Sequence, residues 1–576
     1  MLFYMVILNL AAGFASASSL AGVCTTAHAR ASLPHDAYQG ILIDDSSVQA
    51  NSFSNISISD VMYPDAVIDY CNVTFAYSHE GRVDDRVLVT YWLPAPDKFE
   101  NRFLATGGGG LAINSGNTSV AGAIPYGAAA GLTDGGFGSF DVQWDEVFLL
   151  ANNTVNWQSV YMMGYQAIHE MTVIGKAFTQ NFYNSNSTLY TYYQGCSEGG
   201  REGFSQVQRF AETYDGAIIG APALRYSFQQ VNHLHSGIVE QTLDYYPPSC
   251  ELDKIANATI KACDGLDGKR DGVVSRTDLC ALQFDLKSII GAPYSCPATV
   301  GSMMTLPAPA QNGTVTEKGI AVVTEILKGL QDSQGRQVYV PYQFGATFAD
   351  AATEFNNATG KWQIPENGLG AQSYGSEWVE RYLLLQNSST LPTLKNVTYD
   401  SIKEWMVLGL HMYSDSLQTT WPDLSSWQEA GNKILHYHGE SDNSIPTAAS
   451  VRYRESVRKI MYPHLSYNAS EAALSEWYKF YSIPGAAHCS DNPYQPNAAF
   501  PQTNLKVMIG WVEKGVAPDT LNATVLLGEN KGANQQICAW PLRPFWNDNG
   551  AVECVYDQKS LNSWFYDLDA IKVPVF

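Results

Sequence analysis

The chain has 576 residues, 45% of them hydrophobic, which is enough to bury one large core and a substantial second unit. Its formal net charge of −22 argues against nucleic acid and anionic lipid as partners, because an acidic surface repels both. After the N-terminal residues, no stretch approaches the roughly 20 uninterrupted apolar residues that cross a bilayer. We therefore expect a globular protein with no nucleic-acid partner and no membrane partner.

The N-terminus predicts a signal peptide over residues 1–17. An apolar run from Leu2 to Leu10 is followed by Ala15-Ser16-Ala17, a pattern typical of a small-residue cleavage site. The basic residues that usually precede such a run are missing, and a buried N-terminal helix is the alternative. The run is too short for a membrane span. We expect the mature protein to be secreted into the extracellular space.

Cysteines and glycosylation sequons agree with export. The ten cysteines predict up to five disulfides in an exported chain, although the sequence leaves their partners open. Asn-X-Ser/Thr sequons are frequent, and in a secreted protein they predict N-linked glycans on surface loops. They lie at Asn55, Asn72, Asn117, Asn152, Asn186, Asn257, Asn312, Asn357, Asn387, Asn396, Asn468 and Asn522.

Short apolar runs alternate with amphipathic segments along the chain, which predicts an α/β fold. We expect early strands over residues 86–93 and 102–105, the second leading into the four glycines Gly107–Gly110. Later strands are expected over 433–437 and 478–483.

The intervening residues 225–430 show few strand patterns and many turns and tryptophans. We interpret them as an inserted lid domain, which leaves residues 18–224 and 431–576 as the catalytic domain.

A candidate nucleophile lies in Gly195-Cys196-Ser197-Glu198-Gly199-Gly200. A strand is expected before it, over 189–193, and a helix after it, over 201–214. This is the context of a nucleophile elbow, in which glycines let the backbone turn sharply and expose the serine hydroxyl. The pattern favours Ser197 as a catalytic serine over a simple Gly-Ser turn.

A serine needs a base and an acid that orients the base, and candidates for both follow expected strands. Asp442 follows strand 433–437 and His488 follows strand 478–483, so the order Ser, Asp, His is that of α/β-hydrolases. Glu440 competes with Asp442 as the acid. His436 and His438 compete as the base, but they precede the acid, and we assign them to packing or loop hydrogen bonds.

The oxyanion of the reaction needs backbone N–H donors. We expect one from Glu198, directly after the nucleophile, and one from Gly108 or Gly109 in the four-glycine run. A flexible connection is the alternative role for these glycines. They lack the Lys-Ser/Thr ending of a phosphate-binding loop.

These motifs together resemble the tannase and feruloyl esterase family, and within it the secreted tannases most closely. The resemblance rests on Cys196-Ser197, on His488-Cys489, on Gly199-Gly200-Arg201-Glu202-Gly203 and on Ile445-Pro446 after Asp442, and it runs from about Cys24 to Phe576. It implies an α/β-hydrolase core with a large lid and the triad Ser197, Asp442 and His488.

The resemblance also implies a disulfide between Cys196 and Cys489, which would hold the nucleophile and the base together. With local spacing, it further pairs Cys24 with Cys71, Cys250 with Cys296, Cys263 with Cys280, and Cys538 with Cys554.

The function implied is hydrolysis of galloyl esters, and of depside bonds, in hydrolysable tannins to release gallic acid through an acyl-enzyme. A feruloyl esterase or another esterase for aromatic acids is the near alternative. A catalytically inactive hydrolase fold used for binding is an alternative of another class, and a peptidase is also conceivable.

A second site is expected within the lid. Asp264, Asp267 and Asp271 lie close together in sequence with glycines between them, a composition that suits Ca²⁺. The resemblance adds the main-chain oxygens of Lys269 and Val273 as ligands of a structural Ca²⁺. The alternative is an Asp/Gly turn held by nearby cysteines. We expect no organic cofactor.

Overall fold

The computed structural model describes residues 19–300, 307–365 and 372–576. The expected signal peptide lies outside the described residues. No helix in the described part of the chain is both long enough and apolar enough to span a membrane.

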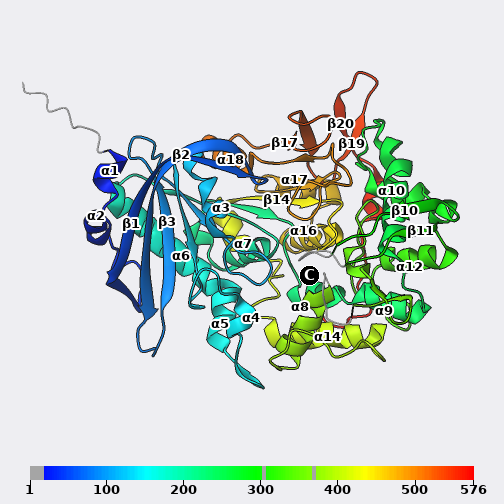
Figure 1. The fold of residues 1–576 in the computed structure, drawn as a ribbon. Coiled ribbons are helices and arrows are strands. Elements are labelled where there is room, and N and C mark those ends of the chain that lie inside the picture. Colours follow the sequence, from blue (N-terminus) through cyan, green and yellow to red (C-terminus); the bar gives the residue numbers. More distant parts are fainter. Residues whose placement is uncertain (1–18, 301–306, 366–371) are drawn as a thin grey trace, which may run out of the picture.

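A nine-stranded mixed sheet forms the centre of the molecule (Figure 1). The pairs from β5 to β15 are parallel, and the first three strands are joined to them in antiparallel fashion. The strands lie in the order β1 (Ile41–Asp60), β2 (Tyr63–His79), β3 (Val87–Pro94), β5 (Ala128–Thr133), β4 (Arg102–Thr106), β8 (Tyr190–Cys196), β9 (Gly216–Gly220), β14 (Lys433–Gly439) and β15 (Tyr478–Ile483).

Helices cover both faces of this sheet, so its central strands are buried on both sides. Successive side chains enter different clusters: Phe103 of β4 packs on one face and Leu104 on the other. One face is covered by α6 (Ala167–Tyr183), α7 (Glu198–Arg209) and α16 (Thr447–Met461), and the other by α3 (Gly116–Ala121) and α18 (Asn504–Lys514). The α/β class expected from the sequence is confirmed.

Two parts of the sheet were not expected. The long hairpin of β1 and β2 contains many polar residues because much of β1 is exposed, and this hides its strand pattern. Strand β5 has the sequence Ala-Ala-Ala-Gly-Leu-Thr, whose residues have low strand propensity. It is a strand because it is fully buried between β3 and β4, where only small side chains fit. Tertiary packing decides both elements.

The residues between β9 and β14 are mainly helical, and none of their described strands joins the nine-stranded sheet. Figure 1 shows them in green and yellow-green beside the sheet. They include α8 (Tyr226–Asn232), α9 (His235–Leu243), α10 (Ser249–Cys263), α11 (Thr277–Gln283), α12 (Glu317–Leu327), α13 (Gln372–Glu377), α14 (Tyr399–Tyr413), α15 (Ser425–Glu429), and the hairpins β10–β11 (Pro293–Cys296, Gln311–Thr314) and β12–β13 (Glu354–Asn356, Lys361–Gln363).

These residues, called the lid segment below, have a core of their own, built mainly from α9, α10 and α12. Helices α8 and α14 differ, because Tyr226 and Phe228 of α8 and Ile402 and Met406 of α14 belong to the larger core of the sheet. These two helices thus pack the segment against the rest of the chain.

The C-terminal residues form small sheets beside β15. They are β16 (Ala499–Phe500), β17 (Thr520–Val525) and β18 (Asn534–Cys538), followed by β19 (Arg543–Trp546) and β20 (Val552–Val555).

Five disulfides join the chain, and they are the five pairings that the resemblance implies. They link Cys24 to Cys71, Cys196 to Cys489, Cys250 to Cys296, Cys263 to Cys280, and Cys538 to Cys554.

Candidate active site

Ser197 lies on a sharp turn between β8 and α7. Its backbone has φ 64° and ψ −122°, a conformation that a non-glycine residue rarely adopts. The turn leaves no room for side chains around it, since a Cβ on Gly195 would lie 2.7 Å from the carbonyl oxygen of Gly199, and one on Gly200 would lie 2.3 Å from that of Gly220. The glycines therefore permit the strained turn that presents the hydroxyl.

His488 bridges Ser197 and Asp442. Its Nε2 lies 2.8 Å from Oγ of Ser197, and its Nδ1 lies 2.7 Å from Oδ2 of Asp442. Because Nδ1 faces a carboxylate it carries the proton, which leaves Nε2 to accept from the serine hydroxyl. This is the geometry of a serine activated by a general base.

The electrostatics suit these roles. Burial by itself would raise the pKa of Asp442, but the charge of His488 and hydrogen bonds from His438 and His488 hold it well below the usual value. Burial would lower the pKa of His488, but the charge of Asp442 and its hydrogen bond raise it. Asp442 is therefore an anion that stabilises the imidazolium formed when His488 takes a proton.

Glu440, the competing acid, lies elsewhere. Its carboxylate forms an ion pair with Arg543, at 2.7 Å from each oxygen, and accepts a hydrogen bond from Thr277 at 2.6 Å. It is fully buried, and its bonds hold the β14 loop to the lid and to β19. The structure gives Glu440 a structural environment and places Asp442 on His488.

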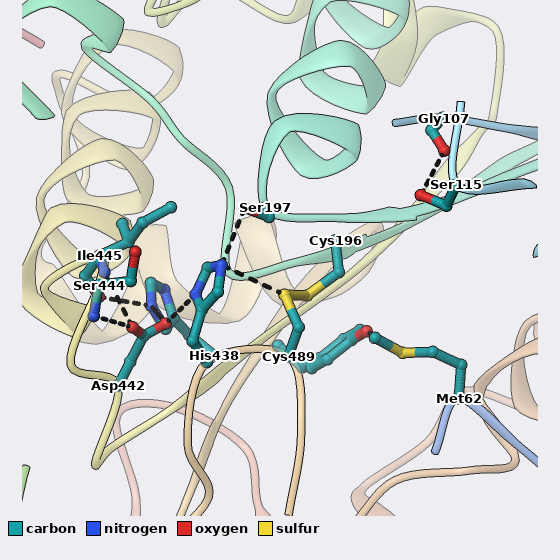
Figure 2. Close-up of a disulfide and its surroundings, with 12 residues drawn as sticks. Met62, Gly107, Ser115, Cys196, Ser197, His438, Asp442, Ser444, Ile445 and Cys489 are labelled. Atoms are coloured by element: carbon teal, nitrogen blue, oxygen red, sulfur yellow. Dashed lines mark hydrogen bonds and ion pairs between the residues drawn. A yellow bond between two sulfur atoms is a disulfide. The ribbon is translucent and has the colours of Figure 1, made fainter. Parts of the chain in front are cut away.

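The disulfide between Cys196 and Cys489 lies directly beside the reacting pair (Figure 2). It joins residues 293 positions apart, and each cysteine is the immediate neighbour of a reacting residue. Sγ of Cys489 lies 3.8 Å from Nε2 of His488. The bridge ties the loop after β15 to the end of β8, so the base cannot move away from the nucleophile with its loop.

The expected N–H donors of the oxyanion hole differ in whether they already have a hydrogen-bond acceptor within the protein. Glu198 is the first residue of α7, so its N–H has no acceptor within the helix. The N–H of Gly108, in contrast, donates to Oε2 of Glu202 at 2.7 Å, and that of Gly109 donates to the carbonyl of Ala112 at 3.2 Å. Both glycine donors are committed inside the protein, so we retain Glu198 alone.

A buried charge network lies beneath the elbow, and the sequence reasoning did not find it. Arg201 binds Glu198 and the carbonyls of Met163 and Gly164. Burial, followed by the charge of Glu198, raises the pKa of Glu202 well above its ordinary value, which favours the neutral acid. The sequence signal for this network was the presence of charged residues on α7, a helix whose apolar residues enter the core.

A second histidine on Asp442 was also missed as part of the site. Nε2 of His438 lies 3.0 Å from Oδ2 of Asp442, the oxygen that binds His488. The sequence signal for this contact was the spacing of four residues between His438 and Asp442. It was not used because His438 directly follows the strand expected over 433–437 and was assigned to packing or loop hydrogen bonds.

The reacting groups line a cavity of about 520 Å³, a size typical of sites for small molecules. One wall comes from the core and contains Met62, Leu104 and Leu505. The residues between β9 and β14 contribute Gln229, Gln230, His233 and Tyr374. The cavity thus combines apolar side chains with hydrogen-bonding groups, and the latter also include Ser115, Thr118, Ser119 and Gln502.

The expected calcium loop is closed by its own hydrogen bonds. Asp264 accepts from the N–H groups of Asp271 and Gly272 at 2.9 Å, and Asp271 pairs with Nζ of Lys269 at 2.9 Å. Among the described residues, no group of three or more His, Cys, Asp or Glu side chains converges as a metal site would require. Oδ2 of Asp267, however, is buried without a hydrogen-bond partner.

Residues 71–561 match the model of the family described as tannase and feruloyl esterase. The chain belongs to this family. It is 49% identical to a tannase of Aspergillus oryzae, with 99% of both chains covered. It is 30% identical to a probable feruloyl esterase of Arthroderma benhamiae, covering 86% of this chain and 87% of that one.

Among solved structures, the tannin acyl hydrolase of Aspergillus niger superimposes with a TM-score of 0.94 at 56% identity, covering 97% of this chain and all of that one. The family relationship, the tannase relative and this structure establish the fold as an α/β hydrolase and the chain as a carboxylic ester hydrolase.

Proposed function

We propose that this family member hydrolyses galloyl esters, including depside bonds, and releases gallic acid through a covalent acyl-enzyme. The observation that carries the proposal is the bridge formed by His488 between Ser197 and Asp442 on the wall of the cavity. The two relatives named for tannin hydrolysis, at 49% and 56% identity over nearly the whole chain, supply the substrate class. An assembled triad argues against an inactive binding protein.

The geometry gives each group one task. Oγ of Ser197 attacks the ester carbonyl carbon while Nε2 of His488 takes the hydroxyl proton, and the N–H of Glu198 faces the oxygen that becomes negative. The tetrahedral intermediate collapses as His488 gives the proton to the leaving alcohol oxygen, which leaves Ser197 acylated.

Water then repeats the sequence. His488 takes a proton from the water that attacks the acyl carbon, and the second tetrahedral intermediate collapses when this proton returns to Oγ of Ser197. Gallic acid leaves, and Ser197 and His488 return to their initial protonation states. Asp442 remains an anion throughout and stabilises the imidazolium in both halves of the reaction.

The lid side of the cavity supports a phenolic acyl group. A galloyl ring has an apolar face and several hydroxyls at its edge, so it needs both packing and hydrogen-bond partners. Gln229, Gln230, His233 and Tyr374 offer such partners, and His233 is held by Asp350 at 2.9 Å. A feruloyl ring carries one hydroxyl and one methoxy group where a galloyl ring carries three hydroxyls, so it uses fewer of these donors and acceptors.

Intact-mass measurement after rapid mixing with methyl gallate tests the proposal. We expect a galloyl increment that maps to Ser197 and is absent in Ser197→Ala. Steady-state release of gallate and ferulate from their methyl esters then decides specificity. A kcat/KM that favours ferulate, with the increment still on Ser197, would make the chain a feruloyl esterase and reject the tannase assignment.

We also propose that residues 264–273 hold a structural Ca²⁺, with side chains of Asp264, Asp267 and Asp271 and main-chain oxygens of Lys269 and Val273. The unpartnered Oδ2 of Asp267 supports this, because a buried carboxylate oxygen needs a donor or a cation. Calcium would supply positive charge that offsets the carboxylates. Its place is structural, since the loop contacts the catalytic unit through Asn497, which binds the carbonyl of Asp271 at 2.8 Å.

We further propose that the protein is exported and glycosylated. Five disulfides with no free cysteine in the described residues support an oxidising compartment. All the sequon asparagines except Asn72 and Asn522 are exposed. Peptide mapping of protein from a eukaryotic host tests this: we expect glycans on the exposed asparagines and a mature N-terminus after residue 17.

A further inference from the structure

A line of buried polar groups extends from Asp442 away from the substrate. Nδ1 of His438 lies 2.7 Å from Oγ of Ser450, and the same oxygen lies 2.9 Å from Nε2 of His436. Nδ1 of His436 in turn lies 2.9 Å from the hydroxyl of Tyr478. All of these side chains are fully or almost fully buried, so no bulk water competes for their hydrogen bonds.

The direction of each hydrogen bond in this line follows from its end at Asp442. Nε2 of His438 faces two acceptors, Oδ2 of Asp442 and the carbonyl of Ile445, both at 3.0 Å. Nε2 therefore carries the ring proton, and Nδ1 accepts from the hydroxyl of Ser450. The lone pair of that hydroxyl is left to accept from the next ring.

The remaining bonds run in the same sense. Nε2 of His436 donates to Ser450, and its Nδ1 accepts the hydroxyl proton of Tyr478. Burial, followed by the neighbouring His438 and then Arg454, lowers the pKa of His436 well below its ordinary value, and burial raises that of Tyr478. Both groups therefore keep the neutral states that this direction requires.

Asp442 is thus held on every side. Its Oδ1 accepts the N–H groups of Ser444 and Ile445 at 2.8 Å each, and its Oδ2 accepts from His438 and His488 (Figure 2). Three of these four donors belong to the protein frame, and only the His488 ring takes part in proton transfer. A carboxylate with this many donors has one orientation, which points the remaining lone pair at Nδ1 of His488.

We propose that His438 is a positioning residue for catalysis, which orients Asp442 through an Nε2–H whose tautomer is set by Ser450, His436 and Tyr478. The inference rests on the proposed esterase function and deepens it. His438 does not touch the substrate, and it acts in both halves of the reaction because both use the same imidazolium. An N–H donor at this point fixes the orientation of the carboxylate.

Steady-state kinetics of two variants of His438 test the proposal. In His438→Leu the donor is lost, and we expect kcat on methyl gallate to fall by about tenfold to a hundredfold with KM changed by less than about twofold. In His438→Gln an amide N–H replaces the ring Nε2–H, and we expect most of kcat to return. His235→Leu removes an equally buried imidazole on α9 and should keep the wild-type kcat.

The outcomes are distinct. Wild-type kcat in a folded His438→Leu variant would overturn the proposal, and so would equal losses in the Leu and Gln variants. If His438→Leu does not fold, Ser450→Ala carries the test: it frees the tautomer of His438, and we expect a several-fold loss of kcat at constant KM. An unchanged kcat in Ser450→Ala would overturn the relay. Failure of the esterase function itself would show as absent turnover in the wild type.

Discussion

Ser197 and His488 share a hydrogen bond of 2.8 Å although 291 positions separate them in the chain. Cys196, directly before Ser197, forms a disulfide with Cys489, directly after His488. A single bridge therefore lies next to both partners of this hydrogen bond. The α/β-hydrolase sheet brings β8 and the loop after β15 to the same edge, and the disulfide then limits how far the loop can move.

Removal of this bridge is expected to reduce turnover more than stability. In Cys196→Ser with Cys489→Ser, the His488 loop gains freedom, and a displacement of about 1 Å lowers kcat on the order of a hundredfold. The matched control is Cys538→Ser with Cys554→Ser, which opens a bridge between β18 and β20. It should lower the melting temperature and leave kcat near wild type. Equal kcat in the two double variants would contradict the positioning role.

The pH profile of kcat/KM should report His488. The pKa of the ring is raised by Asp442, so the ring stays protonated to higher pH than an isolated imidazole does. Because only the neutral ring accepts the serine proton, activity is lost as the pH falls through this raised pKa. We expect the acid limb to lie above about 6.5, the ordinary pKa of histidine. A limb that lies at or below the ordinary value would show that the charge of Asp442 does not dominate.

Substitutions of the two acidic residues in the β14 loop, Asp442 and Glu440, should have different effects: one on activity and the other on stability. Asp442→Asn removes the anion and the correct tautomer of His488, and we expect kcat to fall by about 10⁴-fold. Glu440→Gln breaks a buried ion pair with Arg543, and we expect the free energy of unfolding to fall by about 3 kcal/mol. Its kcat per folded molecule should stay within a few-fold of wild type. Denaturant unfolding and active-site titration measure the two quantities.

Glu202 should tolerate amidation. Burial raises the pKa of its carboxyl group, which favours the neutral acid, and the group accepts the N–H of Gly108 at 2.7 Å. Glu202→Gln keeps an acceptor and a neutral group, so we expect kcat within about threefold of wild type. Glu202→Leu leaves the Gly108 N–H without its acceptor, which costs about 1–3 kcal/mol in stability. A large activity loss in the Gln variant alone would mean that Glu202 is ionised.

Calcium removal should destabilise the lid. We expect dialysis against a chelator to lower the melting temperature by several degrees, and added Ca²⁺ to restore it, since a ligand bound only to the folded state stabilises that state. Asp267→Asn should start from the lower value and respond weakly to Ca²⁺. The control is Asp285→Asn, an exposed helix-cap aspartate outside the loop. A wild-type melting temperature that ignores both chelator and Ca²⁺ would remove calcium from the description.

Local sequence was sufficient for the nucleophile elbow and for the family. The glycines around Ser197 are dictated by a turn that allows no Cβ, so the pattern appears within a few residues. The strands that carry Asp442 and His488 are buried on both faces, so they appear as short apolar runs. In each of these cases the signal lies within a few consecutive residues.

Only the tertiary structure decided which polar groups meet. His438 and Glu440 lie four and two residues before the catalytic acid, yet one binds Asp442 and the other binds Arg543, 103 positions away. The N–H of Gly108 is committed to Glu202, 94 positions away, which no local pattern shows. Likewise, β5 is a strand because it is buried between β3 and β4, although its residues have low strand propensity. Hydrogen bonds and burial between distant segments depend on how the sheet orders its strands, and that order is a property of the whole chain.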